Sequence, residues 1–206
     1  MSKKQAHGRH GLLIVAFLAC GGIRGQPQLP QTKTFTSATA GYVAQYPDTW
    51  YVLERSLSTL YIVNFPPSQR VRAVTLPSGG ASIAVVPPPQ GTANAEQWAK
   101  RDLKPGMVLV SKTNNQLKSS DSDAPIEVTE MQLTRGLHGP DLYNVDCYFT
   151  VGGHLFAGRL TYWSGDSKAQ EYLETLRHVI RSLRVSSESG GVRGDGGAPK
   201  GPAGRH

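Results

Sequence analysis

Residues 143–163, with the sequence YNVDCYFTVGGHLFAGRLTYW, contain two runs rich in aromatic and β-branched residues on either side of Gly152-Gly153. A glycine pair between two such runs is typical of a two-residue β-hairpin turn. Pairing Val151 with His154 sets the register of the hairpin. It predicts a mostly apolar face with the pairs Phe149–Phe156, Cys147–Gly158, Val145–Leu160 and Tyr143–Tyr162, and an opposite face with Asp146–Arg159 and Asn144–Thr161.

The strand expected before this hairpin has an irregular apolar pattern. Residues 126–133 are rich in apolar side chains, but their parity changes partway along (Ile126 and Val128 against Met131 and Leu133). A regular strand with one buried face keeps a single parity. A β-bulge near Thr129-Glu130 would reconcile the two halves, so we expect a bulged strand here.

A long helix is expected after the hairpin, from about Ser167 to Leu183. Its first turn has the spacing of a capping box, because Gln170 follows Ser167 by three residues. Apolar residues recur along the segment at three- and four-residue steps, the spacing of one helix face. They predict a core-facing stripe of Ala169, Tyr172, Leu173, Leu176, Val179, Ile180 and Leu183.

The N-terminal half predicts four short strands. Residues 42–46 and 50–54 indicate a short hairpin around the turn Pro47-Asp48-Thr49. Two further strands are expected at 60–65 and 81–86, and prolines follow each of them.

One helix is expected after these strands, over residues 95–103. Asn94 is a candidate N-cap with Gln97 three residues on, and Pro105-Gly106 follows the last turn. Together with the C-terminal half, this order predicts an α+β fold, in which an antiparallel β-sheet is packed by two main helices.

The start of this region resembles the PsbP-like fold. The resemblance rests on Gly41-Tyr42 and Tyr46-Pro47-x-x-Trp50, followed by the hairpin and the closing helix. This superfamily includes the extrinsic P protein of photosystem II and bacterial exported proteins or lipoproteins of the LpqN and DcrB type. The resemblance covers residues 35–185 and implies an α/β/α sandwich with an accessory, partner-binding role. No site motif matches, so it implies no functional residue.

The two ends of the chain differ in composition from the middle. Residues 1–25 have the order of a secretory signal peptide, with a basic start, the apolar run 12–20 and small residues after it. The segment around Cys20 also resembles a lipobox, so Cys20 is a candidate for lipidation and membrane anchoring; otherwise cleavage after Gly21 or Gly25 is expected. A polar linker is expected at 26–34, and a disordered Gly/Ser/Pro-rich tail at 186–206.

The positive charge of the chain lies mainly at its ends. The formal net charge is +7, of which residues 1–25 carry +4 and residues 186–206 carry +1. The remaining net charge of +2 leaves the domain without the electrostatic footprint of a nucleic-acid-binding protein. Because residues 1–25 predict export, the expected location is periplasmic or extracellular, with membrane anchoring if Cys20 is lipidated.

No motif for catalysis, cofactor binding or metal binding is found. There is no G-x-S-x-G sequence, and the histidines lack the spacing of metal ligands. Cys147 falls on the apolar face of the hairpin, where a small buried thiol is expected. We therefore predict no catalytic residue, no cofactor and no metal site.

The leading hypothesis for function is an exported noncatalytic accessory domain that binds a protein partner or supports an envelope complex. Most aromatic residues are expected in the core. Tyr51 and Tyr148 have outward parity and are the candidates for an exposed partner surface. Two alternatives remain: an enzyme such as a hydrolase with an unrecognised pocket, and a periplasmic protein that captures a small ligand between sheet and helix.

Overall fold

The computed structural model describes residues 31–53, 58–67, 76–135 and 142–186. The predicted export segment, Cys20, residues 26–30 of the predicted linker and residues 187–206 of the predicted tail lie outside the described residues. A first strand, β1 (Thr32–Ser37), begins within the predicted linker and before the expected domain start at residue 35.

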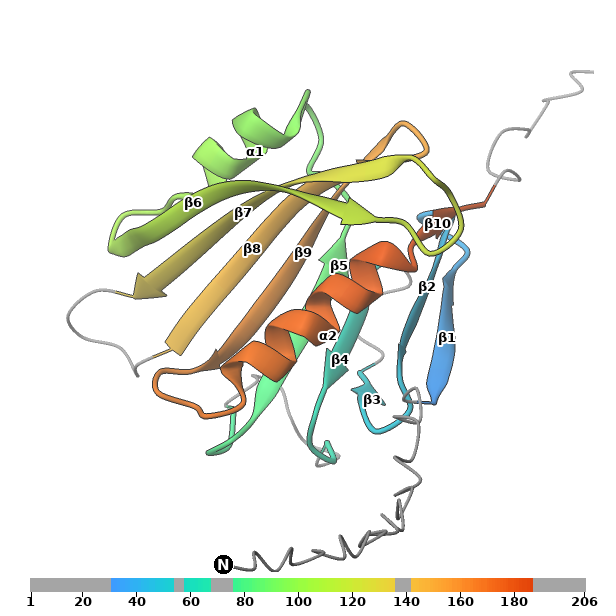
Figure 1. Cartoon of the computed structure of the whole chain (residues 1–206). Helices are drawn as coiled ribbons and strands as arrows, with labels where there is room; N and C mark the ends of the chain where they lie inside the picture. The colour runs from blue at the N-terminus through green and yellow to red at the C-terminus, as the bar shows by residue number, and fades with distance from the viewer. Residues whose placement is uncertain (1–30, 54–57, 68–75, 136–141, 187–206) are drawn as a thin grey trace, which may run out of the picture.

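The main element is a seven-stranded antiparallel sheet with the order β3-β4-β5-β9-β8-β7-β6. Helix α2 (Ala169–Arg181) lies across one face, and the short helix α1 (Ala95–Asp102) covers part of the other, as Figure 1 shows. This confirms the predicted α+β fold with helices on both faces of the sheet. Its strands are β3 (Tyr51–Val52), β4 (Leu60–Val63), β5 (Ala81–Val86), β6 (Met107–Lys118), β7 (Pro125–Arg135), β8 (Leu142–Val151) and β9 (His154–Trp163).

A second sheet of three strands lies beside α2, with the order β1-β2-β10 (Figure 1). Its other strands are β2 (Tyr42–Pro47) and β10 (Arg184–Val185). The predicted hairpin between residues 42–46 and 50–54 is wrong, because β2 pairs with β1 and β10 whereas β3 pairs with β4. The chain turns at Pro47 and passes from one sheet to the other. Trp50 packs its ring edge-on against Tyr172 of α2 at 6.2 Å, which anchors this crossing in the core.

The predicted β8–β9 hairpin is confirmed in every cross-strand pair, from Val151–His154 to Tyr143–Tyr162. Gly152 and Gly153 form the turn with φ angles of 56° and 80°, a backbone region that side chains other than glycine rarely adopt. As expected, Asp146 and Arg159 face each other on the less apolar face of the hairpin, which is the face that α1 partly covers.

Strand β7 contains no bulge where the sequence predicted one. Its pairing with β8 is continuous from Val128 to Thr134, so the bulge near Thr129-Glu130 is wrong. The change of parity has another cause, because both faces of β7 are covered. Ile126 and Val128 belong to the core under α2, whereas Met131 and Leu133 belong to a smaller core under α1.

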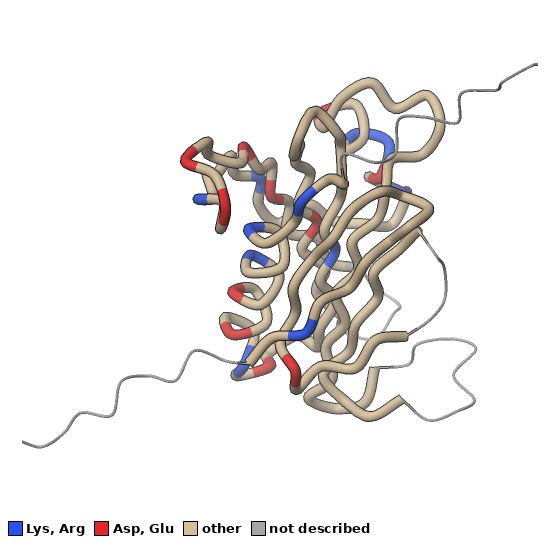
Figure 2. Tube along the Cα trace, turned by 90° about the vertical axis from the view of Figure 1, so that its right-hand side faces the viewer, with Lys and Arg blue, Asp and Glu red and all other residues tan. Residues whose placement is uncertain are grey.

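The two helices begin differently. At α1 the predicted capping box is confirmed: the Gln97 amide N–H donates to Asn94 Oδ1 at 2.8 Å, and the Ala93 N–H donates to Gln97 Oε1 at 2.7 Å. At α2 the capping box of Ser167 is wrong, because the N-cap is Lys168 and no side chain caps it. The acidic residues of α2, Glu171 and Glu174, lie in its first half, and its arginines, Arg177 and Arg181, lie in its second half (Figure 2). No helix within the described residues is long and apolar enough to cross a bilayer.

Candidate functional site

Strand β6 forms one edge of the main sheet and was not expected from the sequence. It pairs along one side with β7, and no strand among the described residues pairs with its other side. An edge strand presents unpaired backbone N–H and C=O groups, which another extended chain can use. The pairing with β7 shifts between Leu109 and Ser111, so β6 has a bulge at Val110.

Exposed apolar side chains are concentrated at the start of this edge. Among the described residues, five large hydrophobic side chains are exposed, and all except Tyr51 lie between residues 103 and 110. We call these four residues the apolar corner: Leu103, Val108, Leu109 and Val110, which are 39–52% exposed. Contiguous exposed apolar residues of this kind mark interaction surfaces.

Basic residues surround the apolar corner. Arg101, Lys104 and Lys112 are exposed, and none of them forms an ion pair with another described residue. Lys100 is paired with Glu96 at 2.9 Å, one helical turn away. Asp102, the other acidic residue of α1, forms an ion pair with Arg159. The corner therefore combines an apolar centre with a positive rim.

A partly buried polar cluster holds the end of α1 against the sheet, next to the apolar corner. Asp102 receives a hydrogen bond of 3.0 Å from the hydroxyl of Tyr148, besides its ion pair with Arg159. Asp146 is buried beside them, and burial together with the Asp102 charge raises its pKa to about 6 against the pull of Arg159. Burial also raises the pKa of Tyr148.

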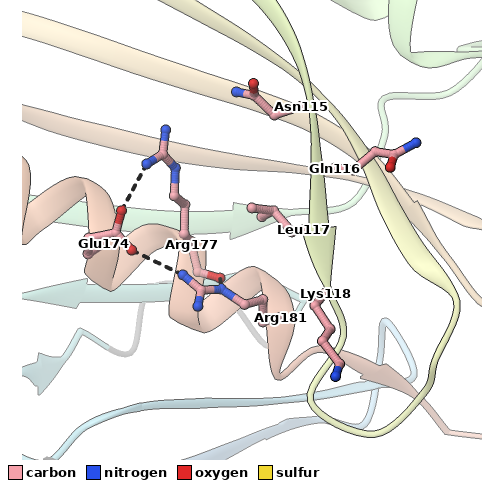
Figure 3. Close-up of a pocket in the computed structure, with 7 residues that line it drawn as sticks. All are labelled: Asn115, Gln116, Leu117, Lys118, Glu174, Arg177 and Arg181. Carbon is pink, nitrogen blue, oxygen red and sulfur yellow. Dashed lines mark hydrogen bonds and ion pairs between the residues drawn. The ribbon is translucent and has the colours of Figure 1, made fainter.

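A groove runs between the second half of β6 and α2, on the other face of the sheet. We call it the β6–α2 groove; it has a volume of about 450 Å³ and is lined by Asn115, Gln116, Leu117, Lys118, Glu174, Arg177 and Arg181. Leu117 points from the strand toward the helix, whereas the Gln116 side chain points away (Figure 3) and donates to Glu127 at 2.7 Å. One end is tied by the Ser120 N–H, which donates to the Arg181 carbonyl at 2.9 Å.

Charged side chains form a chain along the helix side of this groove. Arg177 contacts the buried Glu130 at 3.1 Å and Glu174 at 2.8 Å, while Arg181 contacts Glu174 at 3.1 Å. Burial lowers the pKa of Arg177, but the hydrogen bonds to Glu174 and Glu130 have the larger combined effect, so the pKa is raised overall. On the strand side Lys118 is exposed and has no hydrogen-bonding or ion-pair partner among the described residues.

A second, smaller groove lies on the opposite side of α2. It has a volume of about 370 Å³ and shares Glu174 and Arg181 with the first. His178 lines it, and burial and the Arg181 charge lower the pKa of the imidazole. An uncharged imidazole adds no positive charge there at neutral pH.

The residues predicted as a partner surface have different positions. Tyr51 is exposed as expected, at 45%. Tyr148 has outward parity as expected, but its predicted exposure is wrong, because α1 covers this part of the sheet and Trp98 packs against its ring at 5.6 Å. Cys147 is buried, and burial raises the pKa of its thiol. Among the described residues, no three His, Cys, Asp or Glu side chains are grouped as metal ligands.

The apolar corner is the feature that sequence reasoning missed. The signal was the run Met107-Val108-Leu109-Val110 directly after Pro105-Gly106, which has the composition of a strand start. The Met107 N–H donates to the Lys104 carbonyl at 3.1 Å across this turn, so α1 leads directly into the edge strand.

Comparison with known proteins finds several similar solved structures. No family model and no curated protein matches the chain. A crystal structure of a protein from Bacteroides thetaiotaomicron has a TM-score of 0.46 at 16% identity. The match covers 77% of this chain and 50% of that protein, so the chain spans about half of its length. PsbP from the cyanobacterium Synechocystis sp. PCC 6803 has a TM-score of 0.45 at 14% identity, covering 81% of this chain and 97% of its own.

A protein of unknown function from Pseudomonas aeruginosa has a TM-score of 0.40 at 16% identity, covering 71% of this chain and 94% of its own. Cyanobacterial PsbP, a member of the superfamily that the sequence resembles, is among these structures. At these identities the likeness concerns the fold and does not extend to function.

Proposed function

We propose that this chain is a noncatalytic accessory domain that binds an extended segment of a partner protein along strand β6. The observation that carries the proposal is the apolar corner, which holds four of the five exposed large hydrophobic residues of the described chain. Covering one such side chain on binding contributes about 1.5–3 kcal/mol at full burial. The unpaired edge of β6 offers backbone hydrogen bonds to the same segment.

The surroundings of the apolar corner define the chemistry of the partner. Arg101, Lys104 and Lys112 form a positive rim with no acid paired to them among the described residues. A complementary segment alternates apolar residues with acidic ones, so that the acids meet this rim while the apolar residues cover Val108 and Val110. If residues 1–25 direct export, as their sequence pattern indicates, the partner lies in the cell envelope.

The proposal is tested with short synthetic peptides and fluorescence anisotropy. A peptide that alternates valine with glutamate should bind the purified protein, and a peptide that alternates valine with lysine should bind more weakly. The variant Leu109→Asp should weaken binding of the glutamate peptide about tenfold, because it removes apolar contact and adds a repelling charge. Added salt should weaken the wild-type interaction as well.

Tyr51→Asp is the matched control, since it places the same charge on the other exposed large hydrophobic residue. It should leave peptide binding unchanged. Equal loss in both variants, or loss in Tyr51→Asp alone, would contradict a site on β6. The proposal also fails if Leu109→Asp changes only the sedimentation of the protein or its binding to anionic vesicles, since the corner would then serve a second copy or a lipid surface.

A further inference from the structure

We propose that strand β6 selects a partner segment with two acidic residues six positions apart on one face, where they meet Lys112 and Lys118. Because it concerns the same edge strand, this selection rests on the function proposed above. It extends the recognised stretch from the apolar corner to the far end of β6. The partner is then defined by the spacing of its acidic residues as well as by its composition.

The side chains of Lys112 and Lys118 lie on the same face of β6. In the antiparallel pairing with β7, Lys112 is opposite Met131 and Lys118 is opposite Pro125, and the register does not shift between these two pairs. Residues an even number of positions apart along a regular strand point to one face. Met131 belongs to the core under α1, so both lysines lie on the α1 side of the sheet.

Side-chain hydrogen bonds between the two lysine positions agree with this register. The Thr129 hydroxyl donates to Asn114 Oδ1 at 3.1 Å, and Gln116 Nε2 donates to Glu127 Oε1 at 2.7 Å. Each bond joins the two members of a cross-strand pair, and the Gln116 side chain points away from α2 (Figure 3). Glu127 is thus held by Gln116, and it forms no ion pair with Lys118.

Both lysines are exposed and can meet a ligand. Neither ammonium group forms a hydrogen bond or an ion pair with another described residue. Lys100 and, to a smaller extent, Lys112 lower the pKa of Glu96, but Glu96 is already paired with Lys100.

The spacing of the two lysines defines the spacing of the acids. Six residues of a β-strand span about 20 Å, a distance over which salt screens most of the repulsion between two exposed charges. A partner strand has the same rise per residue. Acidic residues six positions apart therefore meet both lysines, whichever way the partner strand runs.

The other face of β6 has a different character. After the bulge, the residues on the α2 side are uncharged: Ser111, Thr113, Asn115 and Leu117. The arginines of α2 beside them, Arg177 and Arg181, are already paired with Glu130 and Glu174. This face therefore fits uncharged partner residues. Lysines on an edge strand also disfavour pairing with neutral or basic strands, so the two lysines both accept an acidic segment and exclude others.

The test compares two peptides of identical composition, each as long as β6, by fluorescence anisotropy with the purified full-length protein. Both are built on alternating valine and threonine and contain two glutamates, six positions apart in one peptide and five positions apart in the other. The first has both glutamates on one face, and the second has them on opposite faces. The first should bind about threefold more tightly, because only it meets both lysines.

Lys118→Gln should abolish the preference for the six-position spacing, because one glutamate loses its partner. Lys168→Gln is the matched control, since it removes an exposed lysine at the start of α2, outside β6. It should leave the preference unchanged.

Equal binding of the two peptides to the wild-type protein would overturn the spacing, as would a preference that survives Lys118→Gln. Neither result affects the proposed function as long as the peptide that alternates valine with glutamate binds and Leu109→Asp weakens its binding. If that peptide does not bind, the proposed function fails and the spacing fails with it.

Discussion

Asp146 is a carboxyl group buried under α1, beside a second carboxylate and one arginine. Its pKa is raised from 3.8 to about 6, first by burial and then by the charge of Asp102. The folded protein therefore keeps a proton on Asp146 that the unfolded chain releases above about pH 4. The contribution of this group to stability is complete below the unfolded pKa and is lost as the pH rises through 6.

Asp146→Asn tests this titration. Relative to the variant, the wild-type protein should lose up to about 3 kcal/mol of unfolding free energy as the pH rises from about 4 to about 7. Urea denaturation at several pH values measures the difference. A difference that stays constant over this range would contradict the prediction, because Asp146 would then not keep its proton in the folded protein.

The packing of α2 on the sheet depends on a single small residue. Gly158 of β9 lies directly under the helix, and a Cβ atom built on it would lie 2.9 Å from Leu176 Cδ1 and 3.3 Å from Ile180 Cδ1. Both of those side chains are fully buried, so they have little room to move. A larger residue at 158 must push the helix away from the strand or force side chains from their rotamers.

Gly158→Ala should therefore destabilise the protein by about 1 kcal/mol, and Gly158→Val by about 2–3 kcal/mol. Thermal and urea unfolding measure both losses. Gly153→Ala is a poor comparison because Gly153 has a positive φ. The comparison is Ala157→Val on the same strand, since Ala157 itself is buried in the core under α1 and not under α2. If the Gly158 variants unfold like wild type, the helix does not approach the strand as closely as described.

The elements that the sequence predicted correctly are those whose signals are local. The β8–β9 register follows from one Gly-Gly turn and an alternating pattern, and the start of α1 follows from Asn94 and Gln97. Strand β6 was missed because its second half, Thr113-Asn114-Asn115-Gln116, is polar, as the solvent-facing edge of a sheet allows. The bulge in β7 was predicted wrongly because a sequence pattern alone does not reveal that both faces of a strand are covered.

The candidate sites required the assembled molecule. Parity alone placed Tyr148 on the outer face, but only the docking of α1 shows that this face is covered there. The β6–α2 groove joins Leu117 to Arg177 and Arg181, which lie far from it in the sequence and form no short motif. In the sequence alone, charged residues along a helix indicate a solvated helix surface. Only the assembled fold shows that the arginines of α2 lie beside the edge strand β6.

The two sheets are joined through Tyr42, which lies in β2 of the small sheet and is fully buried. Its hydroxyl accepts a hydrogen bond from the Leu60 N–H at 2.8 Å and donates one to the Val85 carbonyl at 3.2 Å, so it contacts β4 and β5 of the large sheet. Burial raises the pKa of Tyr42 to about 12, which keeps the hydroxyl protonated as a donor.

Tyr42→Phe should cost about 1–3 kcal/mol of unfolding free energy, because it leaves a buried N–H without a partner while the ring keeps its contacts. Tyr46→Phe is the matched control: it lies two residues along the same strand and its hydroxyl has no hydrogen-bond partner among the described residues, so its cost should stay below about 0.5 kcal/mol. Urea denaturation compares the two. Equal costs would show that the ring of Tyr42 joins the sheets and that its hydroxyl does not. A larger cost in Tyr42→Phe alone would show that the two hydrogen bonds of the Tyr42 hydroxyl help to join the sheets.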